Sequence, residues 1–221
     1  MILSRFFGLV LLAFTTACGT TASSVSSTQE VEAPSDDPAA SAEMVPIALG
    51  QLTPGVRYSL ETDPVISVAP ETQWGASPAP GGIALVSGQT TLRILTGVEE
   101  AYVELGATEP IAQDAAGILE QLRRNDRANV TGSGEMQFGG ETVGYVDMES
   151  VVDPIESEGG TLILQVSGEP VRLADHFVNR VMVVPAEPGP ILVIVSGTEQ
   201  SGLEQTLADV ASLLASVRVE E

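Results

Sequence analysis

Short runs of hydrophobic residues recur along most of the chain, and each is bounded by glycine, proline or a polar cluster. Runs of about four to eight residues that are rich in valine, isoleucine and leucine and end at turn residues are typical of β-strands. We therefore predict strands at residues 65–68, 83–86, 92–95, 101–105, 161–166, 177–184 and 190–196.

Turn residues separate two pairs of neighbouring predicted strands, and each of these turns predicts a β-hairpin. Gly139 and Gly140 separate two segments, 135–138 and 141–148, in which apolar and polar residues alternate. Glycine accepts the positive φ that a two-residue hairpin turn requires. The stretch Glu-Pro-Gly at 187–189 separates the last two predicted strands in the same way, because proline and glycine both favour turns.

Two other segments carry apolar residues at intervals of three and four positions, which is the spacing of one face of an α-helix. The first begins after Asp114, a good N-cap residue, and extends to about Asn125. The second begins at Ser201, where Glu204 completes a capping-box pattern. The apolar faces comprise Ala115, Ile118, Leu119 and Leu122 in the first segment and Leu203, Leu207, Val210, Leu214 and Val217 in the second.

The order of these elements predicts a single α+β domain over residues 46–221. Strands outnumber helices and do not alternate with them, which argues against a parallel doubly wound sheet. We expect a curved antiparallel sheet with the two amphipathic helices packed on it. A domain of about 175 residues is large enough for one hydrophobic core.

Residues 1–18 have the pattern of an export signal. Arg5 precedes an apolar run at 6–14, and small residues follow up to Cys18. This run suits the hydrophobic region of a signal peptide, whereas a helix that crosses a membrane needs about 20 apolar residues.

The end of this segment, Thr15-Thr16-Ala17-Cys18, resembles the lipobox of bacterial lipoproteins. The resemblance implies a signal peptide at 1–17, cleavage before Cys18, and attachment of a diacylglyceryl group to the Cys18 thiol. Two or more acyl chains anchor a protein stably to a membrane, since each buried methylene contributes about 0.8 kcal/mol. An ordinary secretory signal with an incidental cysteine is the alternative.

Residues 18–45 join this cysteine to the predicted domain. They are rich in serine, threonine and alanine, and they carry acidic residues but no basic one. Such a composition predicts a disordered acidic tether. A flexible chain of this length spans roughly 30 Å, enough to hold the domain clear of the bilayer.

The chain is strongly acidic, with 30 acidic residues against nine basic ones and a formal net charge of −21. All the basic residues are arginine. This charge repels phosphate and argues against nucleic acid as a partner. It also suits a salt-rich exterior, where screening weakens self-repulsion, although genomic base composition could equally account for the absence of lysine.

Residues that could support catalysis or metal binding are few. One cysteine and one histidine exclude an intramolecular disulfide and Cys- or His-cluster metal sites. A nucleophile needs an adjacent base, but Ser133 at 132–134 lacks the nucleophile-elbow pattern, and we interpret His176 as a partly exposed residue before a strand. The acidic run at 153–160 lacks the spacing of a calcium loop and is interpreted as a solvated turn. We expect no catalytic residue, no cofactor and no metal site.

Trp74 and a group of arginines are the remaining candidates for binding. We interpret Trp74 as a core or sheet-edge anchor, with an exposed stacking platform as the alternative. Arg123, Arg124 and Arg127 are predicted near the end of the first helix, where they complement its dipole. A docking patch for an acidic partner or anionic lipid is the alternative there.

Most of residues 50–220 resemble the PsbP-like α/β sandwich of small secreted and lipid-anchored bacterial proteins. This resemblance implies an accessory or binding role without a common set of catalytic residues. It rests on Leu-Thr-Pro-Gly at 52–55, Trp74 after 70–71, the helix before the Gly-Gly hairpin, and Leu-Ala-Ser-Val-Arg at 214–218.

The sequence is compatible with three functions. The first is a non-catalytic module, held through lipid on Cys18 at the extracytoplasmic side of a bacterial envelope membrane, that binds an envelope protein or a small ligand. The second is a lipoprotein that carries an apolar ligand in a cavity between sheet and helices. The third is a hydrolase, which would need His176 or a carboxylate pair buried in a cleft.

Overall fold

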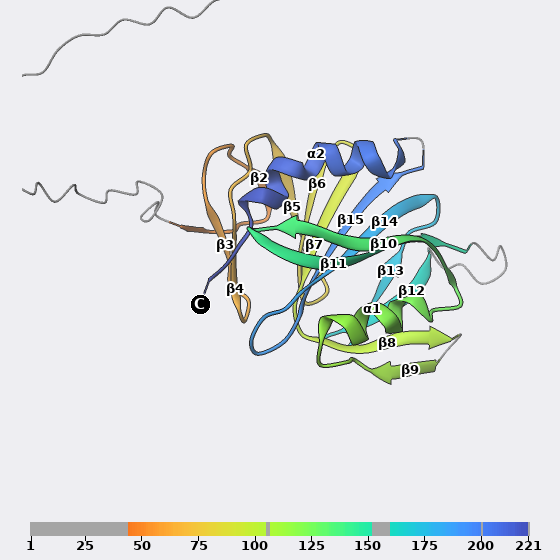
Figure 1. Cartoon of the computed structure of the whole chain (residues 1–221). Helices are drawn as coiled ribbons and strands as arrows, with labels where there is room; N and C mark the ends of the chain where they lie inside the picture. Colours follow the sequence, from red (N-terminus) through yellow and green to blue (C-terminus); the bar gives the residue numbers. More distant parts are fainter. Residues whose placement is uncertain (1–43, 105–106, 152–159, 200, 221) are drawn as a thin grey trace, which may run out of the picture. The chain divides into compact units, whose positions relative to one another are not determined.

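A computed structural model of the chain describes residues 44–104, 107–151, 160–199 and 201–220, which fall within the unit Ala39–Glu221 (Figure 1). The predicted signal peptide, Cys18 and nearly all of the predicted tether lie outside the described residues. No helix in these ranges combines the length and the hydropathy needed to cross a bilayer.

An eight-stranded sheet forms the centre of this unit, and every neighbouring pair of its strands is antiparallel. Its order is β10 (Ala128–Phe138), β11 (Glu141–Ser150), β14 (Phe177–Val184), β15 (Ile191–Thr198), β7 (Thr90–Leu95), β6 (Gly82–Ser87), β5 (Trp74–Ala79) and β2 (Gly50–Leu52).

Both faces of the central sheet are buried. In β15, Ile191 and Val193 belong to one hydrophobic cluster, while Leu192 and Ile194 belong to the other, and all four are at most 1% exposed. Because successive side chains of a strand point to opposite faces, a strand covered on both sides is an unbroken hydrophobic run. This explains the long apolar sequence of β14 and β15.

Each face is covered by one helix and one four-stranded sheet. Helix α2 (Gly202–Ser216) and a first small sheet contribute to one cluster, and helix α1 (Ala115–Arg123) and a second small sheet contribute to the other. The first small sheet has the order β1 (Val45–Pro46), β3 (Tyr58–Leu60), β4 (Val65–Val68) and β16 (Arg218–Glu220). The second has the order β13 (Glu169–Leu173), β12 (Thr161–Val166), β8 (Val98–Glu104) and β9 (Ala107–Pro110).

The α+β prediction of one curved antiparallel sheet carrying two helices is therefore wrong. Strands make up 55% of the described residues and form three sheets, so the fold is β-rich. The two helices are short and lie on opposite faces of the central sheet. Strand β9 was not predicted from the sequence. None of its residues is buried, and it lacks the hydrophobic run on which the prediction of a strand depends.

The predicted hairpins are confirmed. Phe138 pairs with Glu141 across Gly139 and Gly140, whose φ angles are 59° and 94°. The second hairpin is formed by β14 and β15, which pair antiparallel. Their pairing runs from Val184 and Ile191, next to the turn, to Phe177 and Thr198.

The helix caps differ from each other. The Asp114 side chain accepts a hydrogen bond from the Gly117 N–H at 2.7 Å, which confirms the predicted N-cap of α1. The predicted capping box of α2 is wrong, because Ser201 has helical backbone angles and makes no side-chain cap. Its hydroxyl lies 3.1 Å from that of Thr198 instead.

Candidate functional site

A groove of about 900 Å³ lies where five separate parts of the chain meet. Strands β4 and β16 form one side, and the β10–β11 turn and the β14–β15 turn contribute the rest. Met44, the first described residue, also lines it. The groove is thus assembled by tertiary packing and corresponds to no continuous sequence motif.

The floor of the groove is apolar. Phe138 and Val184 are 3% and 4% exposed and belong to the core cluster beneath α2, while Val65 is 40% exposed. Pro185 and Ala186 extend this apolar lining along the β14–β15 turn. A ligand with apolar groups would therefore gain contact area here by covering surface that faces water.

The rim of the groove is acidic. Asp63, Glu141 and Glu187 are exposed, and Glu220 is partly exposed. Arg218 is the one basic side chain among the groove's lining residues. Four carboxylates against one guanidinium give this surface a formal charge of −3, so it attracts cations and repels anions.

Local contacts hold the Arg218 side chain at the end of α2. Its Nη1 donates hydrogen bonds to the carbonyl oxygens of Ala215 at 2.8 Å and Val217 at 2.7 Å. These carbonyls lie at the C-terminal end of α2, where the helix dipole favours a positive charge. The Glu220 carboxylate accepts a hydrogen bond from the Ser67 hydroxyl of β4, which restricts its movement.

The residues considered for catalysis do not come together. The His176 side chain is 76% exposed, has a φ of 63°, and lies 3.7 Å from the carboxylate of Glu199. Ser133 is an exposed residue in β10, whereas His176 precedes β14. The interpretation of His176 as a residue just before a strand is confirmed, but its side chain is exposed and not partly exposed as expected.

Trp74 is 2% exposed and belongs to the core beneath α2, which confirms its interpretation as a core anchor. It is not available as a stacking platform. In the described part of the chain, no cluster of three or more His, Cys, Asp or Glu side chains is arranged to hold a metal ion. The acidic run at 153–160 lies outside the described residues apart from Gly160.

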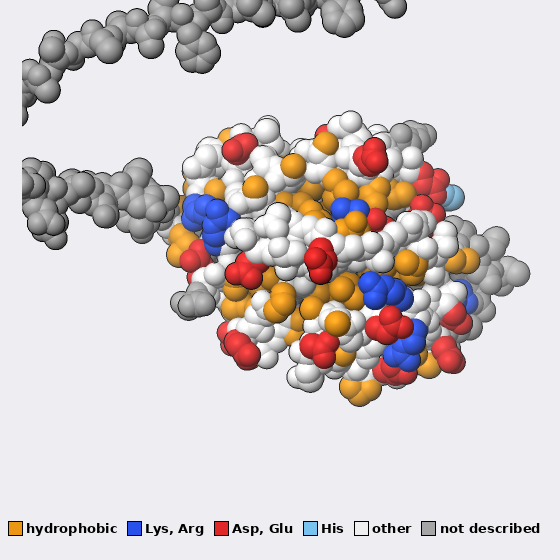
Figure 2. Space-filling model, viewed as in Figure 1, with side chains coloured by type: hydrophobic (Ala, Val, Ile, Leu, Met, Phe, Trp, Pro, Cys, Tyr) orange, Lys and Arg blue, Asp and Glu red, His pale blue; other side chains and the backbone are white. Residues whose placement is uncertain are grey.

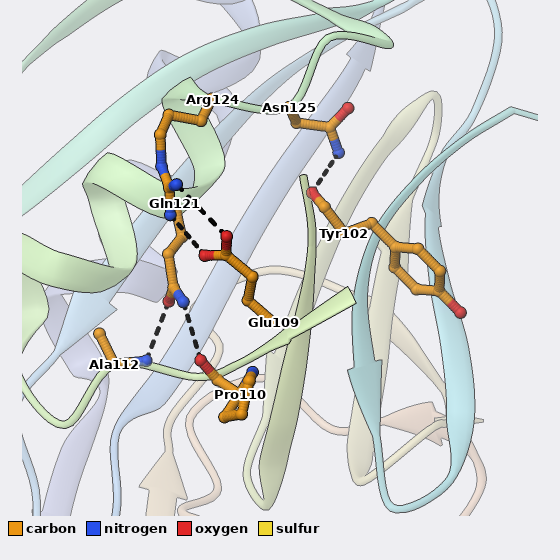
Figure 3. Close-up of polar contacts among 7 residues, drawn as sticks. All are labelled: Tyr102, Glu109, Pro110, Ala112, Gln121, Arg124 and Asn125. Atoms are coloured by element: carbon orange, nitrogen blue, oxygen red, sulfur yellow. Dashed lines mark hydrogen bonds and ion pairs between the residues drawn. The ribbon is translucent and has the colours of Figure 1, made fainter. Parts of the chain in front are cut away.

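The arginines at the end of α1 take part in local contacts. Arg124 forms an ion pair with Glu109 at 2.6 Å, and Arg123 lies 3.6 Å from Glu120. Gln121 accepts a hydrogen bond from the N–H of Ala112 and donates one to the carbonyl of Pro110, as Figure 3 shows. These contacts join α1 to β9 and favour the structural interpretation of Arg123 and Arg124 over a docking patch.

The pKa of Glu109 provides a test of this ion pair. The hydrogen bond from Arg124 is the main cause that lowers the pKa of the Glu109 carboxyl below its usual value. A lowered pKa in the folded state means that the stabilising contribution is present above the usual glutamate pKa and is lost as the pH falls. We expect Arg124→Gln to return the Glu109 titration, followed by NMR, to the usual glutamate range. An unchanged midpoint would contradict this assignment.

A buried polar cluster on the central sheet escaped the sequence analysis. The Arg180 guanidinium binds both carboxylate oxygens of Asp147, at 2.7 and 2.8 Å, and lies 3.6 Å from the centre of the Tyr145 ring. Both charged side chains are largely buried, at 13% and 10% exposure. Burial alone lowers the pKa of Arg180, but the hydrogen bonds and charge of Asp147 outweigh it, so the pKa lies above its usual value.

Gly132 and Gly134 make room for this cluster. A Cβ atom at Gly132 would lie 2.9 Å from the Asp147 carboxylate, and one at Gly134 would lie 3.0 Å from the Tyr145 hydroxyl. The Gly-Ser-Gly sequence is therefore explained by side chains from β11 that lie over the backbone of β10. The two glycines were the feature of the sequence that could have indicated the cluster.

Comparison with known proteins gives distant structural likenesses only. No family model matches the chain, and no curated protein matches it. CyanoP, the cyanobacterial PsbP of Synechocystis, is 13% identical, with a TM-score of 0.43 over 83% of this chain and 99% of that one. LpqN, involved in cell envelope biogenesis of Mycobacterium tuberculosis, is 11% identical, with a TM-score of 0.30 over 76% of this chain and 87% of that one.

A protein of Bacteroides thetaiotaomicron is also similar, at 11% identity and a TM-score of 0.36 over 79% of this chain. The chain spans only 50% of the length of that protein. At these levels of similarity, neither a site nor an activity follows for this chain.

Proposed function

We propose that this chain is a lipid-anchored, non-catalytic module of the bacterial cell envelope that binds a cationic and partly apolar partner in the groove. The observation that carries the binding role is the combination of an apolar floor with four rim carboxylates. The anchor rests on the lipobox resemblance at Cys18 and on the tether predicted at 18–45.

The two properties of the groove act on different steps of binding. Exposed carboxylates attract a positively charged partner and accelerate its approach, and this attraction weakens as salt increases. Apolar contacts with Val65 and the β14–β15 turn would then slow dissociation, because they are made only after water has left the groove. A partner that carries both positively charged and apolar groups should therefore bind more tightly than a partner that carries only one of the two.

Two observations weigh against the other functions. The exposed His176 side chain lacks the buried, oriented position that a general base in a hydrolase would need. For the carrier of an apolar ligand, the interface between α2 and the central sheet is filled by Val210, Leu213 and Leu214, which are at most 3% exposed.

A peptide titration tests the binding role. The probe is a short peptide of alternating lysine and valine, added to the chain from Gly19 onward and followed by calorimetry at low salt. We expect Glu141→Gln combined with Glu187→Gln to weaken binding by about two- to thirtyfold, since two exposed ion pairs contribute about 0.2–1 kcal/mol each.

Controls separate the groove from the overall charge of the chain. Glu71→Gln combined with Glu204→Gln removes two exposed carboxylates that do not line the groove, and this variant should bind as the wild type does. Peptides of alternating glutamate and valine or of alternating lysine and serine should bind more weakly. Equal losses in the two double variants would contradict the assignment to the groove.

A further inference from the structure

Strand β10 differs from the other edge strands of the described sheets. Three sheets have six edges, and five of these are formed by strands of two to five residues: β1, β16, β2, β13 and β9. The sixth is β10, with 11 residues at the edge of the central sheet. A long free edge presents a row of unpaired backbone N–H and C=O groups to another strand, whereas very short edge strands limit such pairing.

The composition of β10 lacks most of the usual protection against pairing. It contains no proline, lysine or arginine, and Glu135 is its one charged residue. Most of its residues are exposed, including Ser133 and Glu135. In a chain with a net charge of −21, this strip of surface is therefore nearly uncharged.

Hydrophobic surface flanks this strip on both sides. Figure 2 shows hydrophobic side chains between α2 and β10, and again between β10 and α1. Met136, Tyr145 and Leu207 are partly buried residues of the first side, while Ala115 and Ala128 are partly buried residues of the second. A strand added to β10 would cover both strips in addition to forming backbone hydrogen bonds.

We propose that β10 pairs antiparallel with β10 of a second copy of this chain, which would continue the central sheet across a two-fold axis. A shared acidic charge opposes self-association, so the surface that allows it should carry the fewest charges. The edge of β10 meets this condition over residues 128–137, whereas Phe138 at its end lines the acidic groove, whose charge favours a basic partner.

The positions of the bulge and of Glu135 restrict the register. The pairing of β10 with β11 shifts between Val130 and Gly132, so the regular part of the strand is 132–138. An axis at Glu135 would place two carboxylates directly opposite each other. An axis at Gly134 pairs each Glu135 with Ser133 of the other copy and leaves no like charges opposite.

Sedimentation of the full chain in detergent, with micelles in excess over protein, tests the proposal. We expect a dimer whose dissociation constant rises about tenfold with Ser133→Asp and falls with Ser133→Arg, because each change alters two symmetric cross-strand pairs with Glu135. The same substitutions at Thr72, an exposed residue between β4 and β5, serve as matched controls and should leave the constant unchanged. Thermal melting of each variant confirms that it folds.

A chain that is monomeric at every concentration would overturn the proposal. A dimer on which the Ser133 and Thr72 substitutions act alike would overturn the assignment to β10. A dimer that both Ser133 substitutions weaken equally would overturn the register with the axis at Gly134.

Discussion

Replacing Asp147 with alanine is expected to lower the free energy of unfolding by about 3 kcal/mol, because it leaves the charge of Arg180 without a partner in a largely buried position. Arg180 makes both of its close ion-pair contacts with this one carboxylate, at 2.7 and 2.8 Å. Tyr145 offers the guanidinium only the face of its ring. Urea denaturation followed by circular dichroism would measure the change.

Two further variants separate a lost ion pair from a general loss of packing. Asp147→Leu combined with Arg180→Met removes both charges and should recover most of the lost stability, since apolar residues of similar volume can replace a buried pair. Glu120→Ala removes an exposed partner of Arg123 and should change stability by less than about 1 kcal/mol. A double variant as unstable as Asp147→Ala would contradict this explanation.

Replacing Cys18 with alanine is expected to release the protein from the membrane fraction. The lipobox resemblance assigns the acyl chains to this thiol, and each methylene that leaves the bilayer removes about 0.8 kcal/mol of binding free energy. Fractionation of cells that express the wild type and the variant would measure the release. Mass spectrometry of the mature wild-type chain should find a lipid-modified N-terminal cysteine.

Ser23→Ala, a substitution in the predicted tether, is the matched control and should leave the chain in the membrane fraction. An unmodified cysteine in the mature chain would contradict the anchor. The same conclusion would follow if Cys18→Ala remained bound to the membrane as firmly as the wild type.

Local features of the fold were predictable because their causes are local. Gly139 and Gly140 adopt the positive φ angles that their hairpin requires, and Asp114 caps the helix that follows it. Trp74 was also assigned correctly, because a large apolar side chain gains most when it is fully buried.

The division into three sheets was not predictable in the same way. Strand β16 consists of three residues, too few to form a recognisable hydrophobic pattern, and it pairs with β4, which lies about 150 positions earlier in the chain. The hydroxyl of Ser201 suggested a capping box, but it contacts Thr198 instead. In each case the tertiary contact decided the outcome.

The groove and the ion pair of Asp147 with Arg180 also depend on tertiary contacts. Val65, Phe138 and Val184 lie far apart in the chain, and only the packed fold brings them to one surface. Asp147 and Arg180 are separated by 33 positions and occupy neighbouring strands. The Gly-Ser-Gly sequence at 132–134 was visible from the beginning, but its role requires knowledge of which side chains lie over it.

The most direct test of the binding role is NMR mapping of the lysine–valine peptide on the chain from Gly19 onward. We expect saturable shifts of backbone amides at 138–141, 184–187 and 218–220, which line or adjoin the groove. Saturable shifts centred on α1 or around His176, with these three segments unchanged, would contradict it.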